Sequence, residues 1–497
     1  MKAKMNFMST IMIMILLSTF IIPSRVFAID KSENNDDYLH TDGSKIFDDY
    51  GNEVRLTGIA WFGNETPNNS YHGLWANTFD DILGKVADNG FNLLRVPLSV
   101  QLVNEWRQGN YPMPDSINDY VNPDLKNKNS LEILDKSIKV CKEKGIKVML
   151  DMHRVVNGGQ SNLWYTDKYS AKDYEECWKW LANHYKNDDT VIAMDIFNEP
   201  HGKGYRQEEC AKWDDSDDAD NWKHEAEKVG KEILDINPNL LIMVEGVETY
   251  PKEGNDYSTK DINNYYGTWW GGNLRGVKEQ PITIENHPNQ VVYSPHDYGP
   301  GVSSQSWFEN GFTKESLLEE AWKPNWFYIK QDNIAPLLIG EWGGNMDGGN
   351  NQKWMQSLAD IIEENNLNHT FWCLNPNSGD TGGILGYDFK TLDVAKMALV
   401  KPTLWQDKDT GKFIGLDHKI NLGKNGTHVT GNSSVDPVIN LGDVNDNGDI
   451  DTVDYIALQK YILNSSSKIN TINADIDKDS RVNTVDLSML KKLILDK

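Results

Sequence analysis

Two glutamates at the ends of apolar runs are the residues best suited to chemistry. Glu199 lies in an Asn-Glu-Pro tripeptide, and Glu341 lies in a Gly-Glu-Trp-Gly tetrapeptide. Breaking a glycosidic bond requires one carboxylic acid that protonates the departing oxygen and a second carboxylate that attacks the sugar carbon or activates water. Two glutamates in comparable positions, far apart along the chain, therefore suit acid–base and nucleophilic chemistry of this kind.

Eight apolar, β-rich runs must position these glutamates, and most of the runs are separated by amphipathic segments. The runs are 54–61, 92–98, 147–153, 191–198, 240–246, 290–296, 336–341 and 369–375. The clearest helical segments are 78–89, 130–144, 173–186, 221–237, 313–332 and 351–366. Apolar strands that alternate with helices are typical of a parallel sheet. Eight such units predict a closed (β/α)8 TIM barrel, and no Gly-rich phosphate loop follows the first strand to favour a nucleotide-binding sheet.

Polar residues gather at the predicted carboxyl ends of six strands, where barrel enzymes assemble their active sites. They are Arg95, His153, Asn198, Glu199, His296, Tyr298, Glu341 and Trp372. Pro200 ends the fourth strand directly after Glu199, because proline cannot continue a hydrogen-bonded ladder. Strands four and seven lie roughly opposite each other in an eight-stranded barrel. We therefore expect Glu199 and Glu341 to point into one cleft with their carboxylates about 5 Å apart.

The ordered set of motifs resembles the retaining glycoside hydrolases of family 5. Besides the two glutamate motifs, the similar positions are Asn92, Arg95, Pro97, His153, Arg154, His296, Tyr298, Phe371 and Trp372. Segments that begin at Trp61, His72, Gly158 and Trp269 resemble the bacterial endoglucanase branch. The resemblance covers residues 40–415. It implies an endo-β-1,4-glucanase that hydrolyses cellulose and related β-glucans by a double displacement with net retention.

The resemblance also implies roles for individual residues, with no cofactor for catalysis. Glu199 would be the general acid/base, with a raised pKa so that it starts protonated. Glu341 would be the nucleophile, kept ionised by Arg95 and Tyr298. Asn198 would hydrogen-bond the sugar 2-hydroxyl.

Further substrate contacts are implied at the mouth of the predicted barrel. His153 and His296 would bind substrate or tune the carboxylates, and Trp372 would form the floor beneath the sugar at the cleavage point. Four more tryptophans are candidates for neighbouring stacking subsites, with ordinary packing as the alternative for each. They are Trp75, Trp164, Trp269 and Trp270.

The chain ends in an internal repeat that predicts a small all-α calcium-binding module. Oxygen-bearing side chains alternate along each loop of the repeat, as Ca²⁺ prefers. The first loop offers Asp443, Asn445, Asn447, Asp451 and Asp454, with the carbonyl of Asp449. The second offers Asp475, Asp477, Asp479, Asn483 and Asp486, with the carbonyl of Arg481. We therefore expect two Ca²⁺ sites.

Paired loops of this kind resemble type I dockerins, and the match covers residues 440–497. Asp takes the place of the Glu that ends an ordinary EF-hand loop, and Ser480 replaces the usual Gly at the second turn. The resemblance implies binding to a cohesin module of a cellulosome scaffold. The pairs Thr452-Val453 and Thr484-Val485 occupy the positions that dockerins use for partner choice.

The remaining sequence features bound the domain organisation. Lys2 and Lys4 precede an apolar run that ends in Val-Phe-Ala, which predicts a signal peptide over 1–28 and a secreted protein with no membrane anchor after cleavage. We expect the catalytic barrel over 29–423, a linker over 424–438 and the dockerin over 439–497. The net charge of −25 and the pI near 4.8 argue against nucleic acid as a partner. The four cysteines lack metal-ligand spacing, and their pairing stays open.

Other functions remain open on the sequence. A β-mannanase or xyloglucanase would use the same pair of carboxylates. An inactive carbohydrate-binding barrel is a second alternative, although the complete set of polar strand-end residues argues against it. A calcium sensor would leave the first 420 or so residues without a role.

Overall fold

The computed structural model describes residues 37–430, 441–445, 450–463, 469–477 and 481–495. Several expectations fall outside these residues. They are the signal peptide at 1–28, the linker residues 431–438 and the calcium ligands Asn447, Asp449 and Asp479. Within the described part of the chain, no helix is both long enough and apolar enough to cross a membrane.

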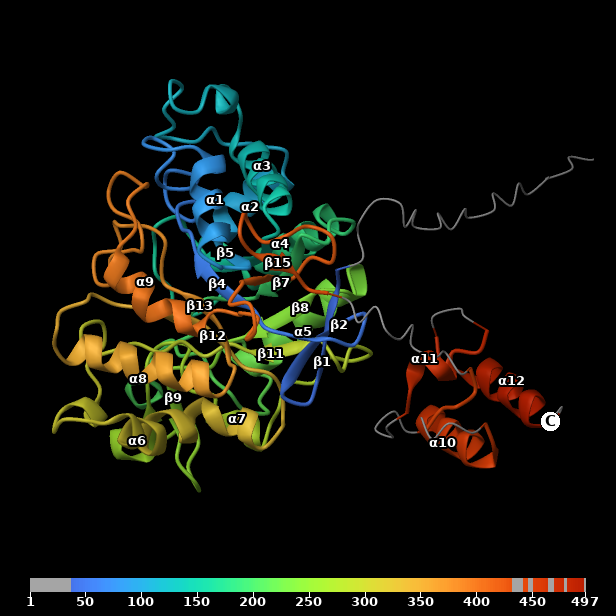
Figure 1. Cartoon of the computed structure of the whole chain (residues 1–497). Coiled ribbons are helices and arrows are strands. Elements are labelled where there is room, and N and C mark those ends of the chain that lie inside the picture. The colour runs from blue at the N-terminus through green and yellow to red at the C-terminus, as the bar shows by residue number, and fades with distance from the viewer. Residues whose placement is uncertain (1–36, 431–440, 446–449, 464–468, 478–480, 496–497) are drawn as a thin grey trace, which may run out of the picture.

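Eight parallel strands form the core of the molecule (Figure 1). They are β4 (Thr57–Ala60), β5 (Leu93–Ser99), β6 (Lys147–Arg154), β7 (Val191–Asp195), β8 (Leu241–Val244), β11 (Val291–Tyr293), β12 (Leu338–Trp342) and β13 (Asn368–Phe371). Their order is β11-β8-β7-β6-β5-β4-β13-β12, and the bridges Tyr293–Leu337 and His296–Glu341 join the two end strands. The predicted closed (β/α)8 barrel is thereby confirmed.

Helices surround these strands (Figure 1). They are α1 (Phe79–Asp88), α2 (Val100–Arg107), α3 (Ser130–Glu143), α4 (Ala171–His184), α5 (Trp222–Ile236), α6 (Lys314–Leu317), α7 (Tyr328–Gln331), α8 (Asn350–Glu364) and α9 (Val394–Val400). A π-helical segment, Leu318–Phe327, with Pro324 inside it, joins α6 to α7. Side chains at the first turn cap several of these helices. Asn129 and Glu132 form a capping box at α3, and Ser170 and Asp173 form one at α4.

The fifth barrel unit departs from the repeating pattern. After β8 come the antiparallel strands β9 (Thr249–Pro251) and β10 (Tyr265–Gly267), followed by a short 3₁₀ turn at Arg275–Lys278. Other 3₁₀ turns lie at Pro123–Leu125, Gly204–Arg206, Ile262–Asn264, Ser306–Phe308 and Lys401–Thr403. The β9–β10 pair is followed by residues 268–270, which line the cleft described below.

The amino end of the barrel is closed by chain segments that precede its first strand and follow its last helix. A three-stranded sheet of β1 (Leu39–Asp42), β2 (Lys45–Asp48) and β3 (Glu53–Val54) contributes apolar side chains to the barrel interior. His418 lies 2.5 Å from Asp37 and 2.9 Å from Asp48, and Lys147 lies 2.7 Å from Asp37. This buried charged cluster ties both segments to the strands.

The barrel unit extends beyond the expected boundary at residue 423. β14 (Ile414–Gly415) pairs with β15 (Thr427–His428), and Val429 is 5% exposed in the core at the barrel floor. The start of the linker at 424 was therefore placed too early. Polar composition predicted a linker, but strand pairing and the burial of Val429 keep this segment on the barrel.

The C-terminal unit is small and all-helical, as expected. It contains α10 (Thr452–Leu463), α11 (Thr471–Ala474) and α12 (Thr484–Leu495). A core of its own holds it together, made of Val444, Leu458, Ala474, Ile476 and Leu490. The side chains of Asp454 and Asp486 accept main-chain N–H groups of their own loops, so each ties a loop to the helix that follows it.

Candidate active site

A cleft of about 850 Å³ opens at the carboxyl ends of the barrel strands. The strand-end residues that line it are His153, Glu199, Tyr298, Glu341 and Trp372. The loop after β13, which carries Trp372, lies across the barrel from the loop after β7, which carries Glu199, given the strand order. Side chains from opposite sides of the barrel therefore face a shared groove.

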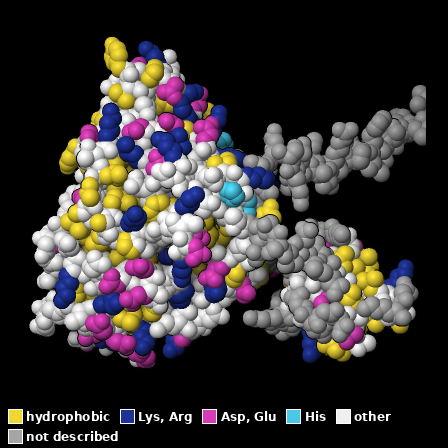
Figure 2. Space-filling model, viewed as in Figure 1, with side chains coloured by type: hydrophobic (Ala, Val, Ile, Leu, Met, Phe, Trp, Pro, Cys, Tyr) yellow, Lys and Arg dark blue, Asp and Glu magenta, His cyan; other side chains and the backbone are white. Residues whose placement is uncertain are grey.

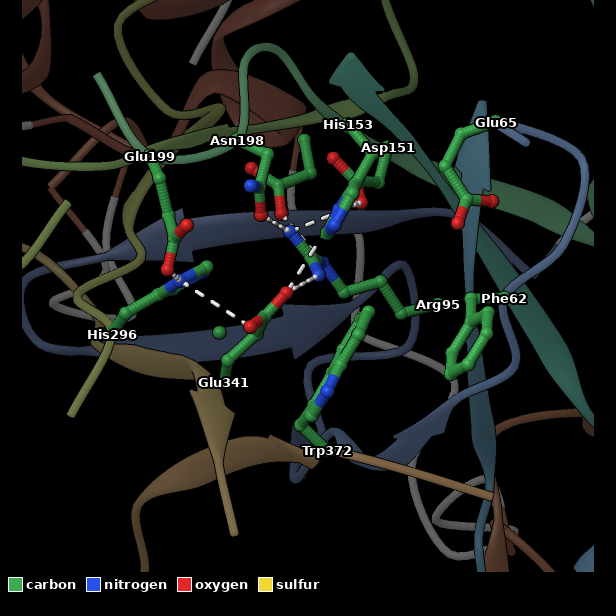
Figure 3. Close-up of polar contacts among 12 residues, drawn as sticks. Phe62, Glu65, Arg95, Asp151, His153, Asn198, Glu199, His296, Glu341 and Trp372 are labelled. Carbon is green, nitrogen blue, oxygen red and sulfur yellow. Dashed lines mark hydrogen bonds and ion pairs between the residues drawn. The ribbon is translucent and has the colours of Figure 1, made fainter. Parts of the chain in front are cut away.

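The two glutamates meet in this cleft as predicted. One carboxylate oxygen of Glu199, one of Glu341 and a ring nitrogen of His296 all lie within 4.8 Å of one another. Figure 3 shows Glu199 and Glu341 with the imidazole of His296 between them. A separation of about 5 Å is typical of retaining glycosidases, whereas inverting enzymes leave room for a water between the carboxylates.

Glu341 is held from two sides. Tyr298 donates its hydroxyl hydrogen to Oε2 over 2.6 Å, and Arg95 forms a short ion pair with Oε1. Arg95 is fully buried, and Glu341 is only 3% exposed. A guanidinium and a hydroxyl that both donate to the carboxylate stabilise its charged form, which is the form that a nucleophile needs.

Arg95 lies at the centre of a cluster of buried acids (Figure 3). Its Nε contacts Asp195 at 2.8 Å, and a terminal nitrogen donates to Oδ1 of Asn198 at 3.0 Å. Its other partners are Asp151 at 3.1 Å and Glu245 at 3.5 Å. Although burial opposes its charge, these carboxylates hold the pKa of Arg95 above its ordinary range. The guanidinium therefore stays charged and fixes the strand-end residues around it.

Glu199 is placed by an unusual backbone and by His296. Its φ of +56° lies in the left-handed region, which a residue with a Cβ seldom adopts. Its Oε1 lies 3.2 Å from Nδ1 of His296. Burial raises the pKa of Glu199, but the hydrogen bond and charge of His296 outweigh burial, so the net pKa is lowered. The expected raised pKa is therefore wrong for this arrangement, because it left out a charged neighbour.

Glu245 is a site residue that the sequence predictions missed. It follows β8 and is fully buried. Its Oε2 accepts the main-chain N–H of Glu199 over 2.8 Å, and its Oε1 lies 3.0 Å from Nε2 of His296. Burial raises the pKa of Glu245 to about 8. Its signal in the sequence was an acidic residue at the end of the fifth apolar run, the same signal that marked Glu199 and Glu341.

Asn198, His153 and Trp372 lie around the pair of Arg95 and Glu341 in Figure 3. Nδ2 of Asn198 is buried and has no hydrogen-bond acceptor within the described part of the chain, so it is available to a ligand hydroxyl. His153 donates or accepts at Nδ1 with Asp151 over 2.7 Å. Burial lowers the pKa of His153, which leaves its ring neutral. The rings of His153 and Trp372 lie parallel, with centroids 5.2 Å apart.

The four tryptophans proposed for stacking differ in exposure and in whether they line the cleft. Trp270 lines the cleft, is 37% exposed and stacks on His201 with centroids 3.9 Å apart, so it offers a free aromatic face. Trp269 also lines the cleft but is only 3% exposed. The prediction for Trp164 is wrong, since this ring is 1% exposed and packs on Trp222. Trp75 is half-buried against Phe389, outside the residues that line the cleft.

The second predicted calcium loop brings its described carboxylates together. Carboxylate oxygens of Asp475, Asp477 and Asp486 lie within 4.8 Å of one another. Three carboxylates at that spacing suit a hard divalent cation held by oxygen ligands. In the first loop, Asp454 is fully buried at the start of α10, in the position that Asp486 has at the start of α12. The two loops are therefore built alike where they are described.

A (β/α)8 barrel whose strand ends hold two carboxylates this close defines the class of barrel glycoside hydrolases. Two family models match the chain. Residues 47–378 match the cellulase model, glycosyl hydrolase family 5, and residues 441–495 match the dockerin type I domain. The chain is thus a glycoside hydrolase that belongs to family 5 and carries a C-terminal type I dockerin domain.

Individual relatives agree with this assignment. Endoglucanase G of Acetivibrio thermocellus is 48% identical over 93% of this chain and 86% of its own length. An endoglucanase of Paenibacillus polymyxa is 45% identical over 73% of this chain and 86% of its own length. Among solved structures, the cellotetraose complex of an endocellulase from Pyrococcus horikoshii is 34% identical, with a TM-score of 0.67 over 74% of this chain and 98% of that chain.

Proposed function

We propose that this chain is a secreted, retaining endo-β-1,4-glucanase that hydrolyses internal bonds of cellulose and related β-glucans. The observation that carries the mechanism is the distance of at most 4.8 Å between carboxylate oxygens of Glu199 and Glu341. An inverting enzyme needs a wider gap between its carboxylates, because a water molecule must fit between one of them and the sugar. The short separation favours direct attack by a carboxylate. The names of the relatives, endoglucanases and endocellulases, support the choice of substrate.

In the first step, a carboxylate oxygen of Glu341 attacks the anomeric carbon. The bond from that carbon to the leaving sugar breaks, and Glu199 gives a proton to the departing oxygen. The neighbouring carboxyl groups of Glu245, Glu341 and Glu199 raise the pKa of His296 despite burial. Nδ1 of His296 lies 3.2 Å from Oε1 of Glu199, within reach of the proton that Glu199 delivers.

In the second step, Glu199 acts as a base and takes a proton from water. The water oxygen attacks the anomeric carbon, and the bond to Glu341 breaks, which restores the free carboxylate. Nδ2 of Asn198 is free to donate to the sugar 2-hydroxyl, a contact that strengthens as charge develops on the ring. No step requires a cofactor, since proton transfer and attack both come from side chains of this chain.

A substrate that continues past the cleavage point on both sides suits the lining of the cleft. Trp372, Ser378 and Asp380 line it from the loop after β13, and Tyr205 and Trp270 line it from the loops after β7 and β10. A polymer that crosses the barrel mouth would contact both groups of residues. We infer that cleavage is internal. β-Mannan and xyloglucan remain the alternatives, because the glutamate pair acts on any of these backbones.

The decisive experiment compares substrates on the full chain. Reducing sugar released from carboxymethylcellulose, mannan, xylan and xyloglucan is measured in parallel, with Glu341→Gln as the control for contaminating activity. Proton NMR then follows the first anomer formed from cellotetraose. We expect preference for the cellulose derivative and the β-anomer as first product. Preference for mannan would overturn the substrate, and an α-anomer would overturn the nucleophile.

We further propose that the C-terminal domain binds two Ca²⁺ ions and a cohesin module, which anchors the enzyme to an extracellular cellulosome. The grouped carboxylates of Asp475, Asp477 and Asp486 support the calcium sites. Val453 and Val485 are about half exposed, at 54% and 50%, on the first turns of two helices built alike. Figure 2 shows hydrophobic side chains gathered on one face of this domain, as a protein-binding surface requires.

A further inference from the structure

Glu199 is contacted from two directions by one neighbouring carboxylate. Oε2 of Glu245 accepts the main-chain N–H of Glu199 over 2.8 Å. Oε1 of Glu245 lies 3.0 Å from Nε2 of His296, whose Nδ1 lies 3.2 Å from Oε1 of Glu199. The contacts form a closed ring that runs from the backbone of Glu199 through Glu245 and His296 to the side chain of Glu199.

The surroundings of Glu245 hold its carboxylate at that point of the ring. Trp222 donates its indole N–H to the main-chain carbonyl of Glu245 over 2.9 Å. Gly271 lies beside Oε2, and a Cβ at position 271 would collide with that oxygen. Three ionisable side chains face Glu245. Arg95 lies 3.5 Å from it. A carboxylate oxygen of Asp195 and a ring nitrogen of His296 lie within 4.8 Å of each other and of a Glu245 oxygen.

Glu341 is held chiefly from the other side of the site. Within the described part of the chain, its carboxylate oxygens accept hydrogen bonds from Arg95 and Tyr298, whereas Nδ1 of His296 lies farther away, 3.7 Å from Oε2. The shorter contacts thus divide between the glutamates: Arg95 and Tyr298 orient Glu341, whereas Glu245 and His296 orient Glu199. A change at Glu245 should therefore affect proton transfer by Glu199 far more than attack by Glu341.

We propose that Glu245 is a positioning residue for the acid/base, holding Glu199 through its main-chain N–H and through His296. This role deepens the proposed function and rests on it. The N–H contact matters because Glu199 has a left-handed backbone, which is unfavourable for a residue with a Cβ and must be held by its neighbours. Without Glu245, Glu199 and His296 would both lose the partner that fixes their orientation.

The test compares two substrates that differ in their need for a proton. Cellotetraose has a sugar as leaving group, which must be protonated, whereas 2,4-dinitrophenyl β-cellobioside releases a stable phenolate without a proton. We expect Glu245→Ala in the full chain to lower kcat/KM for cellotetraose by roughly 10²-fold, the lower range of general acid catalysis. The loss for the dinitrophenyl substrate should be only a few-fold, about 0.8 kcal/mol or less.

Glu245→Gln separates the two contacts of this carboxylate. The amide oxygen can still accept the N–H of Glu199, but the amide nitrogen then replaces the carboxyl oxygen that faces Nε2 of His296. We expect an intermediate loss with the same difference between the substrates. Added azide should raise kcat of Glu245→Ala on the dinitrophenyl substrate, because azide attacks the glycosyl-enzyme without base catalysis.

Asp195→Asn is the matched control, since Asp195 is an equally buried acid that contacts Arg95 at 2.8 Å rather than Glu199. Both substrates need Glu341, which Arg95 holds, so this variant should lower both rates alike. Equal losses on both substrates in the Glu245 variants would overturn the positioning role while leaving the proposed function intact. A wild-type chain that hydrolyses neither substrate would overturn the proposed function and this role together.

Gly271→Ala keeps the proposal testable if the Glu245 variants do not fold. Its methyl group would push Oε2 of Glu245 away from the Glu199 N–H while the carboxylate itself stays in the chain. The same selective loss on cellotetraose is expected. An equal loss on both substrates, or none on either, would contradict the role of Glu245.

Discussion

Tyr298 donates its hydroxyl hydrogen to Oε2 of Glu341 over 2.6 Å, on the side of the carboxylate away from its Arg95 contact. A hydrogen bond to a charged group contributes about 1.5–3 kcal/mol, so Tyr298→Phe should lower kcat/KM by roughly 10–150-fold. Because both cellotetraose and the dinitrophenyl cellobioside require the nucleophile, both should be affected. Steady-state kinetics check this, and wild-type rates in the variant would show that Arg95 alone is sufficient.

The two glutamates should differ in their response to an external nucleophile. Glu199→Ala should lose roughly 10²–10⁴-fold on cellotetraose, because general acid catalysis contributes that factor. Azide should restore turnover of the dinitrophenyl substrate and yield a β-glycosyl azide, since Glu341 can still form the covalent intermediate. Glu341→Ala should give no β-azide product. Product analysis by NMR checks the assignment, and the reverse pattern would exchange the two roles.

Asn198 offers a buried Nδ2 without an acceptor, while its Oδ1 accepts from Arg95 over 3.0 Å. Asn198→Asp keeps the acceptor and removes the donor, so it should lower kcat more than it raises KM. On a 2-deoxy-2-fluoro cellobioside the variant should differ little from wild type, because that substrate lacks the hydroxyl. Equal losses on both substrates would show that Asn198 only supports the fold.

The buried charged cluster at the amino end of the barrel should make the stability of the fold depend on pH. Burial lowers the pKa of His418, but hydrogen bonds to Asp37 and Asp48 outweigh it and raise this pKa to about 9 from an ordinary 6.5. A raised pKa in the folded state stabilises the fold fully below about pH 6.5, and the effect is lost as pH rises through about 9. Thermal unfolding should show a large deficit for His418→Gln at pH 6 and a small one at pH 10.

The two carboxylates of this cluster act at the opposite end of the pH scale. His418 and other partners lower the pKa of Asp37 and Asp48, in spite of burial. Their contribution is present above the ordinary value of 3.8 and is lost as pH falls below it. A deficit of His418→Gln that is the same at pH 6 and pH 10 would contradict this account of the floor.

Calcium should be linked to the folding of the C-terminal domain. Asp486 accepts the N–H groups of Ile476 and Asn483 and lies among the grouped carboxylates, so its charge suits a bound cation. Calorimetry on the full chain should find two Ca²⁺ sites in wild type and one in Asp486→Ala. Because metal binding is coupled to folding, chelator should remove helical signal from this domain. Unchanged helicity in chelator would contradict the prediction.

The stacking role predicted for Trp270 can be tested against a buried tryptophan as the control. Trp270 has an exposed face on the cleft, whereas Trp164 is buried against Trp222. Trp270→Ala should raise KM for cellotetraose by roughly tenfold, about 1.4 kcal/mol, with a normal thermal midpoint. Trp164→Phe should lower the midpoint and leave KM unchanged. A normal KM in Trp270→Ala would remove this residue from the substrate path.

The barrel and the glutamate pair were predictable because both leave local signals. Each strand is a continuous apolar run, and polar residues such as Glu199 and Glu341 stand out where the run ends. Glu245 leaves the same signal, but its importance depends on a contact with Glu199 that only folding creates. The sequence therefore indicates which residues reach the barrel mouth more reliably than which of them touch.

Burial and charge balance were the parts that sequence could not supply. Trp164 and Trp270 are the same residue type, and only tertiary packing separates a core ring from a cleft-lining ring. The lowered pKa of Glu199 depends on the protonation of His296, which in turn depends on Glu245 and Glu341. The exposure of a ring and the pKa of a carboxyl group depend on contacts among several chain segments, so neither can be predicted from a motif or its spacing.

The closed floor of the barrel also determines where this enzyme can be cut. Val429 is buried and β15 is paired, so a shortened catalytic unit that stops at residue 423 would lose an interior apolar side chain and a strand partner. Truncation after residue 430 would leave both in place. A protease that separates the two domains beyond that point should therefore release a hydrolase with undiminished heat resistance but without its dockerin domain.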